Sequence, residues 1–431
     1  MKAIASCFAS IVGEENAVCP WENIPGDRQK ALLQVIASST PPSCIVYPST
    51  IEQLAAVITE ANQNKWRILP CGSGSKLNWG GLVKGVDVVV STERLNKMIE
   101  HAVGDLTVTV EAGMKFSDLQ KILTASKQFL ALDPTSPESA TIGGIVATGD
   151  TGSLRQRYGS VRDQVLGITF VRADGEIATA GGRVVKNVAG YDLMKLFTGS
   201  FGTLGMIAQV TFRVYPMSEA SVTVVLSGKA VAVSQAADTL RNSALTPTQA
   251  DVVSSQLVSE LGLGQGLGLI ARFQSIAESV KEQSTRLLEV GDKLGLQGAV
   301  YSAESEADLW ERLRKQMRFS SYEPAITCKI GVVPTSAVEV LTRAELGWIH
   351  VASGLGVLRF DGENNVDKVL GMRKLCQTNG GFLTILEAPV RVKQELDVWG
   401  YTGNALQLMR RVKEQFDGDK ILSPGRFVGG I

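Results

Sequence analysis

The stretch WRILPCGSGSKLNWGG, residues 66–81, joins a short strand pattern to a glycine-rich loop. An amphipathic helix is predicted before it, because apolar residues follow Ser49-Thr50 at helical spacing. These residues are Ile51, Leu54, Ala55, Ile58 and Ala61. SCIVYP (43–48) has the composition of another strand. The order strand, helix, strand, loop predicts a βαβ unit whose second strand ends in the loop PCGSGSK (70–76).

The loop PCGSGSK can direct successive backbone N–H groups at a phosphate, because its small residues permit such a turn. Neither common nucleotide fingerprint is complete. A Walker A loop needs glycine where Ser75 stands, and a Rossmann loop needs a third glycine where Leu77 stands. Taken alone, the loop predicts either an anion-binding turn or an ordinary structural loop.

The composition excludes several classes of protein. The chain has 431 residues, which suggests two or three domains, and its 43 Lys and Arg residues balance 43 Asp and Glu residues. A neutral chain lacks the basic surface of a nucleic-acid-binding protein. Its six cysteines include no C-x-x-C pair, so a zinc knuckle or an iron–sulfur cluster is not expected.

No apolar run of about 20 residues exists, so no transmembrane helix is predicted. The segment AIASCFASIV after Lys2 is expected to form an amphipathic helix rather than a secretory signal. We therefore expect a cytoplasmic protein. The neutral charge also permits a peripheral attachment to the membrane through partners.

Further strands and helices are predicted on both sides of Pro216. LTVTVEAG (106–113) alternates as a strand, 115–129 is a helix, and 166–182 is a hairpin that turns at Asp174-Gly175. The segment 133–167 is rich in small residues and is either a ligand-lining segment or a long connector. After Pro216, alternating strands and helices predict an antiparallel sheet with helices on one side.

Several motifs in this order resemble the flavin domain of the vanillyl-alcohol oxidase / p-cresol methylhydroxylase (PCMH) superfamily. The similar segments are PCGSGSK, SATIGG (139–144), RYGSVRDQVLG (157–167), VVKNVAGYDLMKLFTGSFGTLG (184–205) and MRRVKEQFDGDKILSPGR (409–426). Within the superfamily they are most similar to the glycolate oxidase (glycolate dehydrogenase) group, and there to the FAD-binding E subunits. The resemblance covers 45–216 and 400–428 and is weak in the middle of the chain.

The resemblance implies an α+β fold: a PCMH-type FAD-binding domain of two subdomains with a ferredoxin-like α+β cap. We expect an N-terminal helical segment (1–40), the FAD-binding domain (41–216) and the cap (217–399). A C-terminal helix and tail (400–431) would return to the FAD domain. The implied site residues are Gly72, Ser73, Gly74, Ser75 and Lys76 at the pyrophosphate, Ser139, Ala140, Thr141, Gly143 and Gly144 at the isoalloxazine ring, Gly149, Ser153 and Tyr158 along the cofactor, Gly202, Gly205 and Ile207 at the ADP end, and Arg426 near the flavin.

Two departures from the family pattern bear on the chemistry. Covalent members of the superfamily carry a histidine in the pyrophosphate loop, and this loop has none, so FAD is expected to be bound non-covalently. No metal is expected. The paired histidines of catalytic 2-hydroxy-acid members are absent, since the chain has only His101, expected in a turn, and His350, expected in a strand as a core residue. Lys186, Tyr191 and Asp192 could be proposed as a base, although structural or cofactor-orienting roles are favoured for each. The catalytic residues therefore stay unknown.

Three functions are consistent with the sequence. The first is an FAD-binding subunit of a glycolate dehydrogenase complex, with a catalytic flavin subunit and an iron–sulfur subunit as partners and glycolate as the substrate of the complex. Its role would be electron transfer or assembly. The second is a self-sufficient FAD-dependent dehydrogenase of a 2-hydroxy acid or an alcohol. The third is a non-catalytic assembly subunit with a vestigial flavin site.

Overall fold

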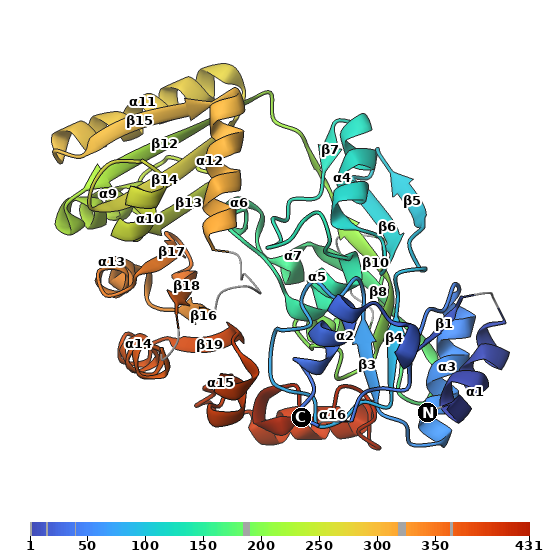
Figure 1. The fold of residues 1–431 in the computed structure, drawn as a ribbon. Coiled ribbons are helices and arrows are strands. Elements are labelled where there is room, and N and C mark those ends of the chain that lie inside the picture. Colours follow the sequence, from blue (N-terminus) through green and yellow to red (C-terminus); the bar gives the residue numbers. More distant parts are fainter. Residues whose placement is uncertain (1, 14–15, 39, 184–189, 318–324, 363–364) are drawn as a thin grey trace. The chain divides into compact units, whose positions relative to one another are not determined.

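The computed structural model describes residues 2–13, 16–38, 40–183, 190–317, 325–362 and 365–431. The chain divides into two compact units (Figure 1). Unit 1 comprises residues 1–151, 160–216 and 393–431, and unit 2 comprises residues 152–159 and 217–392. Helices and strands mix in both units, which confirms the α+β class.

The first sheet of unit 1 has four strands in the order β1-β2-β4-β3. These strands are β1 (Val18–Pro20), β2 (Cys44–Val46), β4 (Val88–Ser91) and β3 (Ile68–Cys71), and β4 is parallel to both β2 and β3. The helices of this part are α1 (Lys2–Val12), α2 (Gly26–Leu33) and α3 (Ile51–Gln63).

Helix α3 begins where the sequence predicts it, because the side chain of Thr50 accepts a hydrogen bond from the backbone N–H of Gln53. Its buried face carries Leu54, Val57, Ile58 and Ala61.

The second sheet of unit 1 has five antiparallel strands in the order β5-β6-β10-β8-β9. They are β5 (Met98–Ala102), β6 (Thr107–Glu111), β10 (Met206–Arg213), β8 (Val165–Val171) and β9 (Ile177–Gly181), and a short pair joins β7 (Gln128–Phe129) to β11 (Tyr215–Pro216). The helices here are α4 (Phe116–Ala125), α5 (Ile142–Thr148), α7 (Val161–Gln164), α8 (Leu193–Phe197) and α16 (Leu406–Phe416). Apolar side chains of both sheets share one core cluster, which includes Val90 of β4 and Ala208 of β10.

Unit 2 contains an antiparallel sheet of eight strands in the order β15-β12-β14-β13-β17-β18-β16-β19. They are β12 (Ala220–Gly228), β13 (Gln249–Val253), β14 (Leu267–Ser275), β15 (Gln297–Ser302), β16 (Ala325–Gly331), β17 (Leu346–His350), β18 (Leu355–Asp361) and β19 (Phe382–Glu387). The larger helices of this unit are α9 (Ala230–Asn242), α11 (Ala277–Lys293), α12 (Ala303–Gln316) and α14 (Val366–Thr378), and the shorter ones are α6 (Arg155–Tyr158), α10 (Ser255–Glu260) and α13 (Ala337–Leu341); α15 (Val390–Glu395) spans the boundary to unit 1.

The sheet of unit 2 consists of two ferredoxin-like halves. In the first half the strands β12, β13, β14 and β15 lie in the spatial order 4-1-3-2, with α9 and α11 in the two crossovers. Strands β16 to β19 repeat this order, with α13 and α14 in the crossovers. The expected ferredoxin-like cap is therefore present twice, and the two halves meet where β13 pairs with β17.

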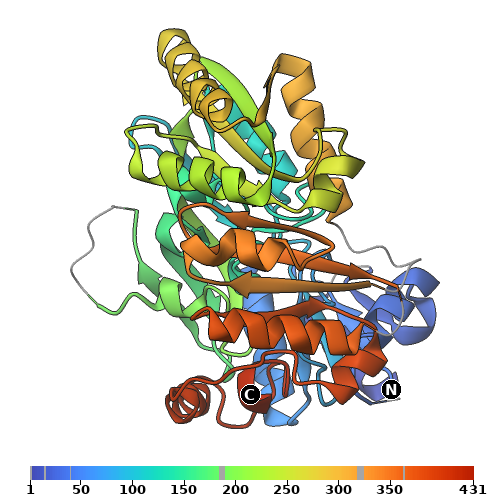
Figure 2. The same ribbon diagram turned by 90° about the vertical axis from the view of Figure 1, so that its left-hand side faces the viewer.

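The crossover helices α11, α9, α13 and α14 pack side by side in one row. Figure 2 looks onto this helix-covered face of the unit 2 sheet. Helix α12 lies on the opposite face: Leu226 of β12 contacts α11, while its neighbour Val225 packs in a cluster with Leu309 and Leu313 of α12. Successive strand residues point to opposite faces, so the two helices cover different sides of the sheet.

Candidate functional site

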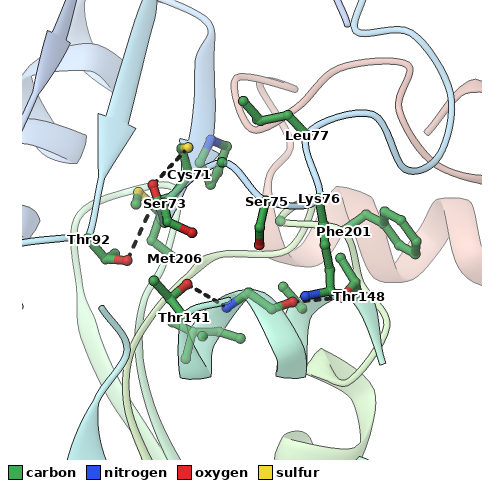
Figure 3. Close-up of a pocket in the computed structure, with 18 of the residues that line it drawn as sticks. Cys71, Ser73, Ser75, Lys76, Leu77, Thr92, Thr141, Thr148, Phe201 and Met206 are labelled. Atoms are coloured by element: carbon green, nitrogen blue, oxygen red, sulfur yellow. Dashed lines mark hydrogen bonds between the residues drawn. The ribbon is translucent and has the colours of Figure 1, made fainter. Parts of the chain in front are cut away.

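A cavity of about 710 Å³, part of it open to solvent, lies in unit 1 beside the loop that follows β3. Its lining comes from residues 70–77, from helix α5, from residues 200–207 and from Arg426. Figure 3 shows this loop on one side of the cavity and α5 on the other, with the Lys76 side chain extending toward the helix.

The loop presents unbonded backbone donors. Among the described residues, none accepts a hydrogen bond from the backbone N–H groups of Ser73, Gly74, Ser75 and Lys76. Gly74 adopts a left-handed conformation with φ +86°, and the amide of Leu77 beyond it bonds back to the carbonyl of Gly74. Consecutive free amides in such a turn form a concave site for an anion.

Glycine allows the loop to approach helix α5 closely. A Cβ atom added at Gly72 would lie 2.1 Å from the Oγ1 atom of Thr141, the residue that caps the first turn of α5. A Cβ atom at Gly143 would lie 2.7 Å from the Cβ atom of Ala112. Side chains at either position would push these segments apart, so glycine is required for the shape of the cavity.

Two buried cations line the cavity. The ammonium of Lys76 lies 3.0 Å from Oδ2 of Asp150, and both side chains are 5% exposed. Arg426 lies in the C-terminal tail, and its Nη2 donates to the carbonyls of Lys76, Leu77 and Trp79. Its Nε atom is buried without a partner among the described residues. Burial lowers the pKa of Arg426 to about 10, so its guanidinium still carries a charge at neutral pH.

The lining of this cavity suits the negatively charged diphosphate of a dinucleotide. The free amides of the loop and the two cations provide positive potential, and the glycines leave room for close approach. Buried polar groups without partners are rare in folded proteins, which makes the Arg426 Nε atom a further indication of a bound group. The residues present therefore fit FAD.

The cavity gives no sign of a reactive thiol for covalent attachment of the flavin. Cys71 lines it, but burial raises the pKa of the Cys71 thiol to about 11. A thiol is a nucleophile only as the thiolate, so burial disfavours reaction of Cys71 at neutral pH.

The structure brings most of the predicted site residues together. The residues that line the cavity are Gly72, Ser73, Gly74, Ser75, Lys76, Thr141, Gly143, Gly144, Gly202, Gly205, Ile207 and Arg426. Ser139 and Ala140 lie next to the lining, and the Ser139 carbonyl accepts a hydrogen bond from the Ser73 hydroxyl. Gly149 ends α5 in a left-handed conformation. These residues belong to separate sequence motifs that line one cavity.

Ser153 and Tyr158 belong to unit 2, which includes residues 152–159, and neither is among the residues that line the cavity. Ser153 Oγ donates a hydrogen bond of 2.5 Å to Oδ2 of Asp251. The other carboxylate oxygen of Asp251 accepts a hydrogen bond of 2.5 Å from Nδ1 of His350. All three side chains are buried, so they form a serine–aspartate–histidine chain inside unit 2.

The remaining candidates for a base have other surroundings. Tyr191 is 88% exposed, and Asp192 pairs with Lys195 within the same helical turn. Lys186 lies outside the described residues. His101 lies in strand β5 and contacts Gln128, so the expectation of a turn there is wrong. The segment 133–167 is not a plain connector, because it contains the helices α5, α6 and α7.

Comparisons with known proteins identify an FAD-binding segment in the chain. Residues 42–181 match the FAD binding domain family. The chain is 25% identical over 428 residues to the D-lactate dehydrogenase [cytochrome], mitochondrial, of Arabidopsis thaliana, covering 90% of this chain and 73% of that protein. It is 32% identical over 178 residues to the glycolate oxidase subunit GlcD of Bacillus subtilis (strain 168), covering 41% of this chain and 38% of that protein.

The crystal structure of p-cresol methylhydroxylase with substrate bound has the same fold, with a TM-score of 0.76, 16% sequence identity, and coverage of 99% of this chain and 96% of that chain. Unit 1 therefore has the PCMH-type FAD-binding fold. The cofactor is FAD, and the chain is an FAD-dependent oxidoreductase. No helix in the described residues is long and apolar enough to span a bilayer.

Sequence reasoning missed three polar residues near these sites. Asp150, Thr135 and Asp251 were not singled out, although each is a partner of a buried side chain. Their partners are 15 to 99 residues away in sequence, as for Thr135 with Asp150 and Asp251 with His350. No local motif marks such pairs.

Proposed function

We propose that this chain is the FAD-binding E-type subunit of a glycolate dehydrogenase complex, working with a catalytic flavin subunit and an iron–sulfur subunit. The observation that carries the proposal is the cavity of unit 1, whose free amides and buried cations suit a dinucleotide. The similarity of the chain to the glycolate oxidase subunit GlcD of Bacillus subtilis supports the substrate class, a small 2-hydroxy acid.

When bound, FAD supplies a hydride acceptor for oxidation of a 2-hydroxy acid. The residues of this chain bind and orient it. The amides of residues 73–76 and the cations of Lys76 and Arg426 would hold the diphosphate. Gly143 and Gly144 at the start of α5 would admit the flavin ring. The cofactor would be held without a covalent bond.

Similarity to the D-lactate dehydrogenase of Arabidopsis thaliana over most of this chain favours a second function, that of a self-sufficient 2-hydroxy-acid dehydrogenase. Oxidation of a hydroxyl group requires a base for its proton. The base stays unassigned, because His350 is buried and bonds Asp251 within unit 2. This function needs no catalytic partner subunit.

An absorption spectrum of the purified chain, before and after acid precipitation, tests the cofactor. A yellow protein that releases FAD into the supernatant supports the proposal. A colourless protein that also fails to take up added FAD contradicts it and favours an assembly subunit with a vestigial site.

Anaerobic addition of glycolate then separates the two enzymatic functions. Loss of the flavin absorption only when the partner subunits are present supports the subunit of a complex. Loss of that absorption in the isolated chain supports the self-sufficient dehydrogenase.

A further inference from the structure

Lys76 and Asp150 form a buried ion pair at the edge of the cavity, although 74 positions separate them in sequence. Burying two charges is costly, and such a pair rarely adds stability over apolar residues of similar size. A pair of this kind inside a ligand cavity therefore calls for a functional reason.

Asp150 is held in place independently of Lys76. The backbone N–H of Thr135 donates 2.9 Å to Oδ2 of Asp150, and the Thr135 hydroxyl donates 2.9 Å to Oδ1. Each carboxylate oxygen thus has a partner even without the ammonium. The carboxylate is a fixed point, and the flexible lysine side chain adjusts to it.

Lys76 has donor capacity left over. An ammonium has three N–H groups, and among the described residues its charged partner is Asp150. The ammonium also lies 5.8 Å from the centroid of the Trp79 ring, within cation–π range. The backbone of Lys76 belongs to the loop with free amides, so its side chain and these amides serve the same part of the cavity.

We propose that Asp150, itself locked by Thr135, is a positioning residue that holds the Lys76 ammonium ready for the diphosphate of FAD. This inference rests on the proposed function only in placing FAD in this cavity. It does not depend on the substrate or on partner subunits.

A positioning role of Asp150 and a purely electrostatic effect of its charge predict opposite changes in the affinity for FAD when Asp150 is neutralised. A carboxylate beside the cavity repels the negatively charged diphosphate, so removing its charge alone would tighten FAD binding. If Asp150 positions Lys76, its removal frees the lysine side chain, and rotamer freedom must then be lost again on binding. FAD binding would weaken.

The test is a titration of the full-length apoprotein with FAD, followed by the change in flavin fluorescence. We expect Asp150→Asn to raise the Kd for FAD by about tenfold and Lys76→Met by at least as much. The double variant should bind no worse than Lys76→Met, because Asp150 acts through Lys76. Unchanged or tighter binding by Asp150→Asn overturns the proposal.

Two further variants keep the test decisive if Asp150→Asn does not fold, which circular dichroism of the apoprotein reveals. Thr135→Val removes one hydrogen bond to Asp150 and keeps the ion pair, and we expect a Kd raised about threefold. Asp150→Glu keeps the charge but moves the carboxylate, and weaker binding is expected again. Wild-type affinity in both variants overturns the proposal.

A matched control is Asp419→Asn, which removes the carboxylate of the exposed ion pair with Lys65. Its affinity for FAD should equal that of the wild type. If the wild-type apoprotein itself does not bind FAD, the proposed function fails. If the wild type binds FAD and Asp150→Asn binds it equally well, only the inference about Asp150 fails.

Discussion

Asp251 and His350 face each other across β13 and β17, the strand pair that joins the two ferredoxin-like halves of unit 2. The Asp251 carboxylate is completely buried and accepts hydrogen bonds from His350 and from Ser153. The ladder between these strands has three residue pairs, from Asp251–His350 to Val253–Trp348. The polar chain therefore reinforces a short connection between the halves.

We predict that Asp251→Asn lowers the free energy of unfolding by about 3 kcal/mol, because it breaks a buried charged network and leaves its donors poorly matched. Ser153→Ala removes one hydrogen bond and should cost about 1 kcal/mol. Urea unfolding followed by tryptophan fluorescence measures both values. A variant Asp251→Asn as stable as the wild type would show that the network contributes little.

Gly72→Ala should abolish or strongly weaken FAD binding, because the new Cβ atom would collide with Oγ1 of Thr141. The matched control is Gly104→Ala, where a Cβ atom would meet nothing within 4 Å. The same FAD titration compares the two variants. Equal affinity of both variants would mean that the approach of the loop to α5 is not required for the cofactor.

Lys413→Met should destabilise unit 1 by about 3–5 kcal/mol. The Lys413 ammonium is buried, bonds Asp417 at 2.5 Å, and donates to the carbonyls of Thr203 and Leu422. Burial lowers the pKa of Lys413, because removing the ammonium from water is unfavourable. The hydrogen-bond partners offset this cost. Lys65→Met, which breaks an exposed pair, should cost less than about 1 kcal/mol. Thermal unfolding of the two variants checks the difference, and equal melting temperatures would refute it.

Cys71 should resist alkylation in the folded protein. Burial raises its thiol pKa to about 11, so at pH 8 about one molecule in a thousand carries the thiolate. The thiolate fraction grows tenfold per pH unit, and modification should follow it upward. Peptide mapping after iodoacetamide treatment, with urea-unfolded protein as the reference, measures the rate. Alkylation at pH 8 as fast as in the unfolded chain would contradict the inert thiol.

Local patterns in the sequence predicted much of the fold. Helix α3 follows from its apolar spacing and from Thr50 at its start, and the hairpin β8–β9 follows from Asp174-Gly175 at its turn. These elements depend on neighbouring residues, so a short window of sequence contains their cause. The duplication of the ferredoxin-like half was not foreseen, because it depends on strand order rather than on local composition.

The candidate site was predicted in part, because some of its residues belong to local sequence motifs. The glycine-rich loop and the start of α5 are continuous motifs, and the structure brings both to one cavity. Asp150 was not predicted because its role depends on Lys76 and Thr135, and only folding brings these residues near it. The position of Ser153 in unit 2 likewise follows from its bond to Asp251, not from the motif around it.

The bond between Arg426 and the loop at Lys76 spans 350 positions of the chain, and it affects the order of events during synthesis. The ribosome makes the loop first, then all of unit 2, and the arginine that holds the loop afterwards. Unit 1 is assembled from three separate segments of the chain, so a nascent polypeptide cannot complete it early. Because we propose that Arg426 helps to hold FAD, we expect cofactor loading only after translation has passed this residue.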